Sequence, residues 1–333
     1  MAVHLPYGGS NAKRVKNCNG CLIQATGLPI RKSGLAARTG SMHHEVQEKC
    51  RVSGKLPEDF LGLVYEEDGE TLTFGEDDLE LAETAHELTE KVLEDYDIDI
   101  FEIEPFVQWI NDLAGGSIDL LGLSANEETV LVLDYKFGLS PVPVKNSDQH
   151  FMYTVSARED KKTVDMFTKA KRVVFVIIQP RIKGQVFTWE TDFMTVNKWQ
   201  KMFAKAMKGK KTKSGEWCKW CPAEATCPTR KRSIMSARLL DPKSHNSLNA
   251  AAGKLEEVEQ WVKAVKEELY LHMMNGLPID GWKIINKRAT RKWIDEEAAQ
   301  EALKDAGIAP SDMVISKMLT APAMEKFLKK NKV

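Results

Sequence analysis

Residues 116–138, GSIDLLGLSANEETVLVLDYKFG, decide the fold of this chain. The runs 116–123 and 130–135 have the apolar composition of buried strands. Asn126 lies between them, and asparagine is a residue type that turns favour. The stretch therefore predicts two strands joined by a turn inside a buried sheet.

Charged side chains are placed at the ends of these two strands. Asp119 belongs to the first, and the second ends in Asp134, Tyr135 and Lys136. Residues i and i+2 of a strand point to the same face, so Asp134 and Lys136 project together. A neighbouring strand can bring Asp119 beside them.

Two carboxylates at a strand end form a hard oxygen site suited to Mg²⁺ or Mn²⁺. A lysine beside that ion can orient or deprotonate water, or stabilise charge on a phosphate. The alternative is a strand end that carries charges for solubility. Because both charges directly follow an apolar run, the sequence favours the functional interpretation.

The remaining segments predict an α/β layered core. Further strands are expected at 98–110, 172–178 and 185–189, and helices at 42–50, 76–94, 148–158, 195–208, 249–275, 295–306 and 321–330. Residues 57–75 are expected to form an irregular acidic loop, and 281–293 a basic hairpin. A boundary near residue 240 divides a core, 1–240, from a mainly helical C-terminal extension, 241–333.

Composition and charge limit the class of protein. The chain has 333 residues, 43% hydrophobic and 29% charged, as in soluble globular proteins. No apolar run approaches the ~20 residues of a membrane span, and the N-terminus has no signal-peptide core, so a cytoplasmic protein is expected. Residues 57–104 carry 19 Asp and Glu against one Lys, whereas 201–232 carry ten Lys and Arg against two Glu. The basic segment is either an anion-binding surface or a solubilising face.

Three of the six cysteines lie close together in the pattern C-x2-C-x5-C: Cys218, Cys221 and Cys227. Three soft ligands in a compact loop suit a soft metal ion or an iron–sulfur cluster. The candidates for a fourth ligand are Cys18, Cys21 and Cys50. A zinc site built from two C-x2-C pairs would leave Cys227 over.

The ordered motifs resemble the PD-(D/E)XK nuclease superfamily, and more closely its RecB-like branch. The matching residues are His44 in GSMHHEVQE, Asp119 in GGSID, Asp134 and Lys136 in LDYKFG, and Gln149 and Tyr153 in QHFMY. The resemblance implies a restriction-endonuclease-like core, with a mixed central sheet flanked by helices. It extends to a phage-encoded family of RecB-like nucleases through residues 177–182 and the GWK…RKW segment.

The resemblance also implies roles for these residues. His44, Asp119 and Asp134 would ligate Mg²⁺ or Mn²⁺ with help from the Tyr135 carbonyl, and Lys136 would be the catalytic lysine. Gln149 and Tyr153 would buttress the site and approach the DNA backbone. His43 is adjacent to His44, and only one of the two can face the site from a helix. The four-residue spacing from Gly40 to His44, and the Glu48 that follows, favour His44. Glu104 matches an acidic residue that often precedes the Asp119 strand.

The cysteines are similar to the iron–sulfur staple of AddB and of CRISPR adaptation nucleases in the same branch. This implies a structural cluster, of the 4Fe-4S type, held by one upstream cysteine and three downstream: Cys18, Cys218, Cys221 and Cys227. Cys21 is second choice for the upstream ligand. Zinc, or cysteines without a metal, are the alternatives.

The expected function is that of a metal-dependent deoxyribonuclease, an exonuclease rather than an endonuclease. It would act on DNA ends or single strands during phage replication or recombination, in the cytoplasm of an infected bacterium. A phage single-strand-annealing or recombination protein is a candidate partner. The alternative is a non-catalytic DNA-binding or DNA-mimicking partner that uses the acidic stretch.

DNA phosphates are expected at basic residues that flank the cysteine loop: Lys208, Lys210, Lys211, Lys213, Arg230 and Arg232. Trp217 and Trp220 either stack on bases of a single strand or pack over the cysteine site. A second basic and aromatic patch, 282–293, either contacts DNA or is merely solvated.

Overall fold

The computed structural model describes residues 5–28, 33–183, 185–236, 243–285 and 296–309. The chain divides into two compact units, Met1–Leu271 and His272–Val333. The first unit is a mixed α/β domain that contains every strand of the described residues. The predicted α/β class is confirmed at this level.

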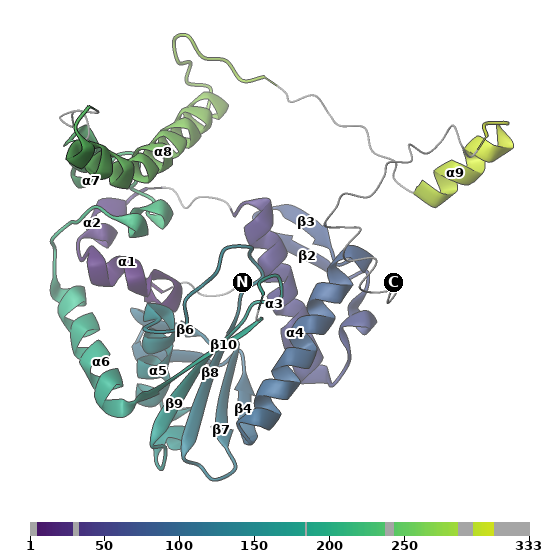
Figure 1. The fold of residues 1–333 in the computed structure, drawn as a ribbon, viewed down its shortest axis with the longest axis vertical. Coiled ribbons are helices and arrows are strands. Elements are labelled where there is room, and N and C mark those ends of the chain that lie inside the picture. The colour runs from purple at the N-terminus through teal and green to yellow at the C-terminus, as the bar shows by residue number, and fades with distance from the viewer. Residues whose placement is uncertain (1–4, 29–32, 184, 237–242, 286–295, 310–333) are drawn as a thin grey trace. The chain divides into compact units, whose positions relative to one another are not determined.

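The centre of the first unit is a five-stranded sheet in the order β10-β9-β8-β7-β4 (Figure 1). Its strands are β4 (Ile98–Ile103), β7 (Leu120–Ser124), β8 (Thr129–Tyr135), β9 (Arg172–Ile178) and β10 (Val186–Asp192). β8 and β9 run parallel, and the other neighbours are antiparallel. The strands β7, β8 and β9 are five to seven residues long and almost continuously buried, which explains why their apolar runs were recognisable in the sequence.

Each face of this sheet packs against helices, because alternate side chains of its strands point to opposite faces (Figure 1). Val130 and Val132 of β8 pack with α5 (Asp148–Glu159) and α6 (Phe193–Lys208). Leu131, Leu133 and Tyr135 pack on the other face with α4 (Glu76–Asp95). The parity of β8 thus places Asp134 on the α5 face, two residues beyond Val132.

The helices around the sheet begin and end at recognisable residues. The Ser147 side chain accepts a hydrogen bond from the His150 amide and caps α5, and Asp192 does the same for α6 through Thr195. α3 (Leu35–Ser53) ends at Gly54, whose φ of 69° is the left-handed conformation that glycine adopts without strain. The predicted helices at 42–50, 76–94, 148–158 and 195–208 are therefore confirmed.

Three predicted segments differ in the structure. The strand expected at 98–110 is broken into β4 and β5 (Phe106–Ile110), because Glu104 has a φ of 48° and Pro105 has no backbone N–H. The strand expected at 116–123 is likewise two strands, β6 (Ala114–Ser117) and β7. Residues 57–75 are not irregular: they contain the 3-10 turn η2 (Pro57–Phe60) and the hairpin β2 (Val64–Glu67) with β3 (Glu70–Thr73).

A second, small sheet joins the N-terminus to the core in the order β1-β6-β5. β1 (Tyr7–Gly8) leads through η1 (Gly9–Asn11) and α1 (Ala12–Asn17) to the short helix α2 (Cys21–Ala25). Ala12 belongs to the main core on the α5 face. The N-terminal segment is therefore an integral part of the first unit.

The remaining described elements lie outside the sheets. They are the turns η3 (Val164–Phe167) and η4 (Glu216–Trp220) and the helices α7 (Pro228–Met235), α8 (His245–Met274) and α9 (Glu296–Asp305). The helices expected at 249–275 and 295–306 are confirmed. Most of the expected hairpin at 281–293 and all of the helix at 321–330 lie outside the described residues. None of the described helices has the length and apolar character of a membrane span.

Candidate functional site

Three carboxylates stand side by side at one end of the central sheet. Ile103 of β4 pairs with Leu120 of β7, and Leu120 pairs with Leu133 of β8. One residue beyond these three, toward the same end of the sheet, lie Glu104, Asp119 and Asp134. The Glu104 amide donates to the Asp119 carbonyl oxygen at 3.2 Å, which continues this register beyond the paired strands. The row follows from strand pairing alone, because antiparallel register fixes which residues are opposite one another.

His44 of α3 reaches this row. Its Nδ1 lies 3.2 Å from Asp119 Oδ1. Ligand atoms of His44, Glu104 and Asp119 all lie within 4.8 Å of one another, and among the described residues they form the one such group of His, Cys, Asp and Glu. His43 points elsewhere: it is fully buried, with Nε2 3.3 Å from Asp78 and its ring stacked on Phe137. The structure thus places His44, not His43, at the site.

Asp134 is held by partners on the α5 face. Lys136 Nζ lies 2.5 Å from Asp134 Oδ2, as their i, i+2 spacing predicts. Gln149 of α5 donates from Nε2 to Asp134 Oδ1 at 2.7 Å and to the Tyr153 hydroxyl at 3.1 Å. Asp134 lies outside the 4.8 Å group, so the structure brings together two of the three expected metal ligands and adds Glu104.

Tyr135 and Tyr153 have structural contacts. The Tyr135 amide donates to Asp119 Oδ2 at 2.6 Å, while its side chain lies on the opposite face with its hydroxyl 2.9 Å from that of Thr89. The Tyr153 ring packs under Gly9, where an added Cβ would come within 2.3 Å of it. Tyr153 is therefore a buried support for Gln149 rather than a surface that faces DNA.

The site concentrates negative charge in a desolvated place. Burial, and next the charge of Asp119, raise the pKa of Glu104 to about 8. Burial also opposes ionisation of Asp119 and of His44, but their mutual attraction outweighs it, so the pKa of Asp119 falls and that of His44 rises. One imidazole nitrogen and several carboxylate oxygens form a donor set for a small divalent cation. The charge of that cation would relieve the repulsion between the carboxylates.

Five cysteines from opposite parts of the chain line one pocket: Cys18, Cys21, Cys218, Cys221 and Cys227. Arg14 of α1 also lines this pocket. Cys50 lies elsewhere, in a core with Met42 and Phe74. Sequence spacing predicted the three downstream cysteines, and the structure adds both upstream candidates rather than choosing between them.

The pocket favours thiolate at Cys18. The Cys21 thiol donates to Cys18 and lowers its pKa; burial opposes this, and the Lys213 amide at 3.4 Å and the charge of Arg14 add to the lowering. The same hydrogen bond raises the pKa of Cys21. No three of the described cysteine sulfurs form a group within 4.8 Å.

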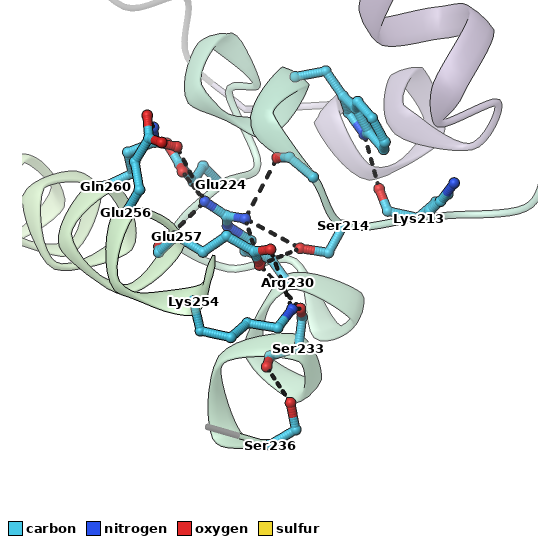
Figure 2. Close-up of polar contacts among 12 residues, drawn as sticks. Lys213, Ser214, Glu224, Arg230, Ser233, Ser236, Lys254, Glu256, Glu257 and Gln260 are labelled. Atoms are coloured by element: carbon cyan, nitrogen blue, oxygen red, sulfur yellow. Dashed lines mark hydrogen bonds and ion pairs between the residues drawn. The ribbon is translucent and has the colours of Figure 1, made fainter. Parts of the chain in front are cut away.

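Arg230 differs from the sequence prediction. Its side chain is fully buried, and it forms ion pairs with Glu224 at 3.1 Å and Glu257 at 3.0 Å (Figure 2). It also donates to Ser214 and Gln260, so it connects α7 and the cysteine loop to α8. A buried guanidinium with these partners does not reach a phosphate, and the expected DNA contact is corrected to a structural role.

The other expected phosphate contacts lie on the surface. Lys208, Lys210, Lys211, Lys213 and Arg232 are exposed. The Gly20 amide donates to the Lys211 carbonyl oxygen at 2.9 Å, which holds this lysine-rich stretch beside the Cys18–Cys21 loop. The two tryptophans differ: Trp217 lines the cysteine pocket and Trp220 is 75% exposed.

Comparisons with known proteins supply a family for the chain. A comparison with curated proteins finds none that matches. One family matches residues 4–333, which is nearly the entire sequence. The chain therefore belongs to the family described as "Protein of unknown function (DUF2800)".

Proposed function

We propose that this protein is a metal-dependent deoxyribonuclease with a restriction-endonuclease-like core, an exonuclease that acts on DNA ends or single strands. One observation carries this proposal: Glu104, Asp119 and Asp134 stand abreast at the sheet end, with His44 beside Asp119 and Lys136 beside Asp134. That arrangement joins hard metal ligands to a cation at one place, as phosphodiester hydrolysis requires.

The donor set fits Mg²⁺ or Mn²⁺. His44, Glu104 and Asp119 would hold the ion, with Asp134 next to them in the row. A bound divalent ion would supply Lewis-acid activation of a phosphoryl oxygen or of water. Mn²⁺ accepts an imidazole ligand more readily than Mg²⁺ does, so His44 favours activity with Mn²⁺.

The protein's own side chains supply orientation and charge. Lys136 Nζ is anchored on Asp134 at 2.5 Å, which points its ammonium at the row, where it would stabilise a phosphate oxygen. Gln149 fixes the other Asp134 oxygen, and Tyr153 fixes Gln149. The Tyr135 amide and His44 occupy one oxygen each of Asp119. The Asp134 and Asp119 carboxylates are therefore oriented before any substrate binds.

We propose further that the cysteine pocket holds an iron–sulfur cluster of the 4Fe-4S type. Cys18, Cys218, Cys221 and Cys227 would bind it, with Cys21 beside Cys18 as a fifth thiol. Thiols from two distant parts of the chain line this one pocket, which supports a cluster with one upstream and three downstream ligands. The bond would tie α1 to the η4–α7 segment. Zinc is the runner-up.

The direct test is cleavage of end-labelled linear and circular DNA with Mg²⁺, with Mn²⁺ and with EDTA. We expect linear DNA to be degraded with either ion, faster with Mn²⁺, and EDTA to abolish the reaction. Circular DNA should persist if the enzyme requires an end. Intact DNA under every condition, with DNA still bound, would instead favour a non-catalytic DNA-binding protein.

The matched control for this assay is chosen from the same sheet. Lys136→Met should abolish cleavage, because it removes the cation at the row but keeps a long side chain. Asp99→Asn removes an exposed carboxylate of β4 and should leave cleavage unchanged. Activity that survives Lys136→Met, or EDTA, would identify a contaminating nuclease and contradict the proposal.

A further inference from the structure

Trp220 has the highest exposed fraction, 75%, of the large hydrophobic side chains exposed in the described part of the chain. An indole ring left in water loses the free energy that burial would supply, so a largely exposed tryptophan on a fixed backbone is informative. Trp217, three residues earlier, shows the ordinary arrangement: it lines the cysteine pocket, and its Nε1 donates to the Lys213 carbonyl oxygen at 3.0 Å.

The backbone of Trp220 is fixed. It is the last residue of η4, between Cys218 and Cys221, and the Cys221 amide donates to the Cys218 carbonyl oxygen at 2.8 Å. Arg14 of α1 donates from Nη1 to the carbonyl oxygen of Trp220. The ring is therefore presented outward from a tightly hydrogen-bonded loop, which reduces the entropy that a ligand would have to remove.

The surroundings of the ring are cationic. Lys219 Nζ lies 5.0 Å from the centroid of the Trp220 ring. Glu216, the acidic residue of η4, is paired with Lys13 at 2.8 Å and is thereby neutralised. The exposed lysines of 208–213 are held beside the Cys18–Cys21 loop by the contact of Lys211 with Gly20, and Lys213 lines the same pocket as Cys218 and Cys221. An aromatic face flanked by ammonium groups matches a nucleobase attached to a phosphate backbone.

The same loop is linked to the carboxylate row by a short series of contacts. Arg14 donates to Asn11 at 2.8 Å, and Asn11 ends η1, which begins at Gly9. Gly9 packs on the Tyr153 ring, and Tyr153 is bonded to Gln149. The loop that carries Trp220 is thus connected to the N-terminal segment that also supports the site.

We propose that Trp220 is a stacking platform for an unpaired base, so that this face of the cysteine loop binds single-stranded nucleic acid. An unpaired base is required because the faces of bases inside a duplex are already stacked. This inference rests on the proposed function for its role, namely guiding a single strand to the carboxylate row. The alternative that we reject is that the Trp220 ring binds a protein partner.

The test is fluorescence anisotropy with labelled oligo-dT, oligo-U and a blunt duplex, in EDTA so that no cleavage occurs. Trp220→Ala should weaken binding of a single strand by roughly 10-fold, as loss of one stacked base does. Trp220→Phe keeps an aromatic face and should weaken it much less. Duplex binding, which depends on phosphates, should be unchanged for both variants.

Tyr270→Ala is the matched control, because Tyr270 is an aromatic side chain of α8 that is 51% exposed and lies outside both basic segments. It should bind single strands as the wild type does. If Trp220→Ala weakens binding of oligo-dT and oligo-U equally, the platform recognises the faces of bases in either kind of strand. If it weakens binding of only one of them, that kind of strand is the ligand.

Two outcomes would overturn the platform. The first is unchanged single-strand affinity of Trp220→Ala, which is also what a protein-binding role predicts. The second is an equal loss on duplex, which would show a general rather than a stacking effect. These results are independent of the proposed nuclease activity: absence of cleavage by the wild type contradicts the nuclease, while the anisotropy remains readable.

Discussion

The carboxylate row and the cysteine pocket both collect residues from distant parts of the sequence, but they are built differently. The row sits on β4, β7 and β8, whose backbone register fixes its members. The pocket sits among α1, α2, η4 and α7, which are five to eight residues long. Elements this short have little stability of their own. A sheet-borne site can keep its geometry without its ion, whereas the pocket should depend on what its thiolates bind.

The largest expected effect breaks the row. Asp119→Asn and Asp134→Asn should each lower cleavage by roughly 1,000-fold or more, because an amide neither balances the charge of a divalent ion nor retains Lys136 as an ion pair. The rate of release of a labelled nucleotide measures this. DNA affinity and melting temperature should remain near wild type, since the sheet carries the fold; full activity in Asp134→Asn would contradict the assignment.

Next in size is the buried guanidinium that fastens the pocket to α8. Arg230→Ala should lower the free energy of unfolding by about 3–5 kcal/mol, because it leaves Glu224 buried without this partner. Chemical denaturation monitored by circular dichroism measures the loss. Arg232→Ala, an exposed neighbour, should change it by less than about 0.5 kcal/mol. Similar effects of the two variants would mean that Arg230 is not a structural anchor.

The dependence of the pocket on its occupant is the third prediction. Anaerobically purified wild-type protein should be brown, with broad visible absorbance and bound iron. Cys218→Ser should bleach it and lower the melting temperature by several degrees. Cys50→Ser, which alters a buried cysteine of another cluster, should keep the iron. A colourless protein with stoichiometric zinc would show that the pocket binds zinc instead.

The smallest effect concerns the exposed lysines at the rim of the pocket. Replacing Lys208, Lys210, Lys211 and Lys213 by Ala should reduce the salt dependence of DNA binding by roughly one unit of slope for each lost phosphate contact. Affinity measured across a salt series, with metal chelated, gives the slope. If the slope does not change, this stretch is a solvated loop and the phosphates are bound elsewhere.

The sequence was sufficient for features that depend on local pattern. The apolar runs of β8 and β9 and the i, i+2 relation of Asp134 and Lys136 follow from strand periodicity, and the structure has them as predicted. The spacing of Cys218, Cys221 and Cys227 similarly located one side of the pocket. The choice of His44 over His43 was correct, because His44 contacts Asp119 whereas His43 contacts Asp78. Helical spacing lets only one of two adjacent residues face the site.

The sequence was insufficient for features that depend on contacts between distant segments. Glu104 joins His44 and Asp119 through the register of β4 with β7. The family resemblance pointed to Glu104 as an acidic residue before the Asp119 strand, but the sequence did not place it among the metal ligands. Arg230 lies in a run of basic residues that looks like a phosphate-binding surface. Its burial depends on Glu257 of a helix that the sequence places in another domain.

The most direct test of the central claim is calorimetric titration of Mn²⁺ into the full-length protein. We expect one saturable site in the wild type, no measurable binding in Asp119→Asn, and affinity weakened by roughly 10- to 100-fold in Glu104→Gln. Asp99→Asn should bind as the wild type does. No Mn²⁺ binding by the wild type, or binding that Asp119→Asn and Glu104→Gln leave unchanged, would contradict a metal site at the carboxylate row.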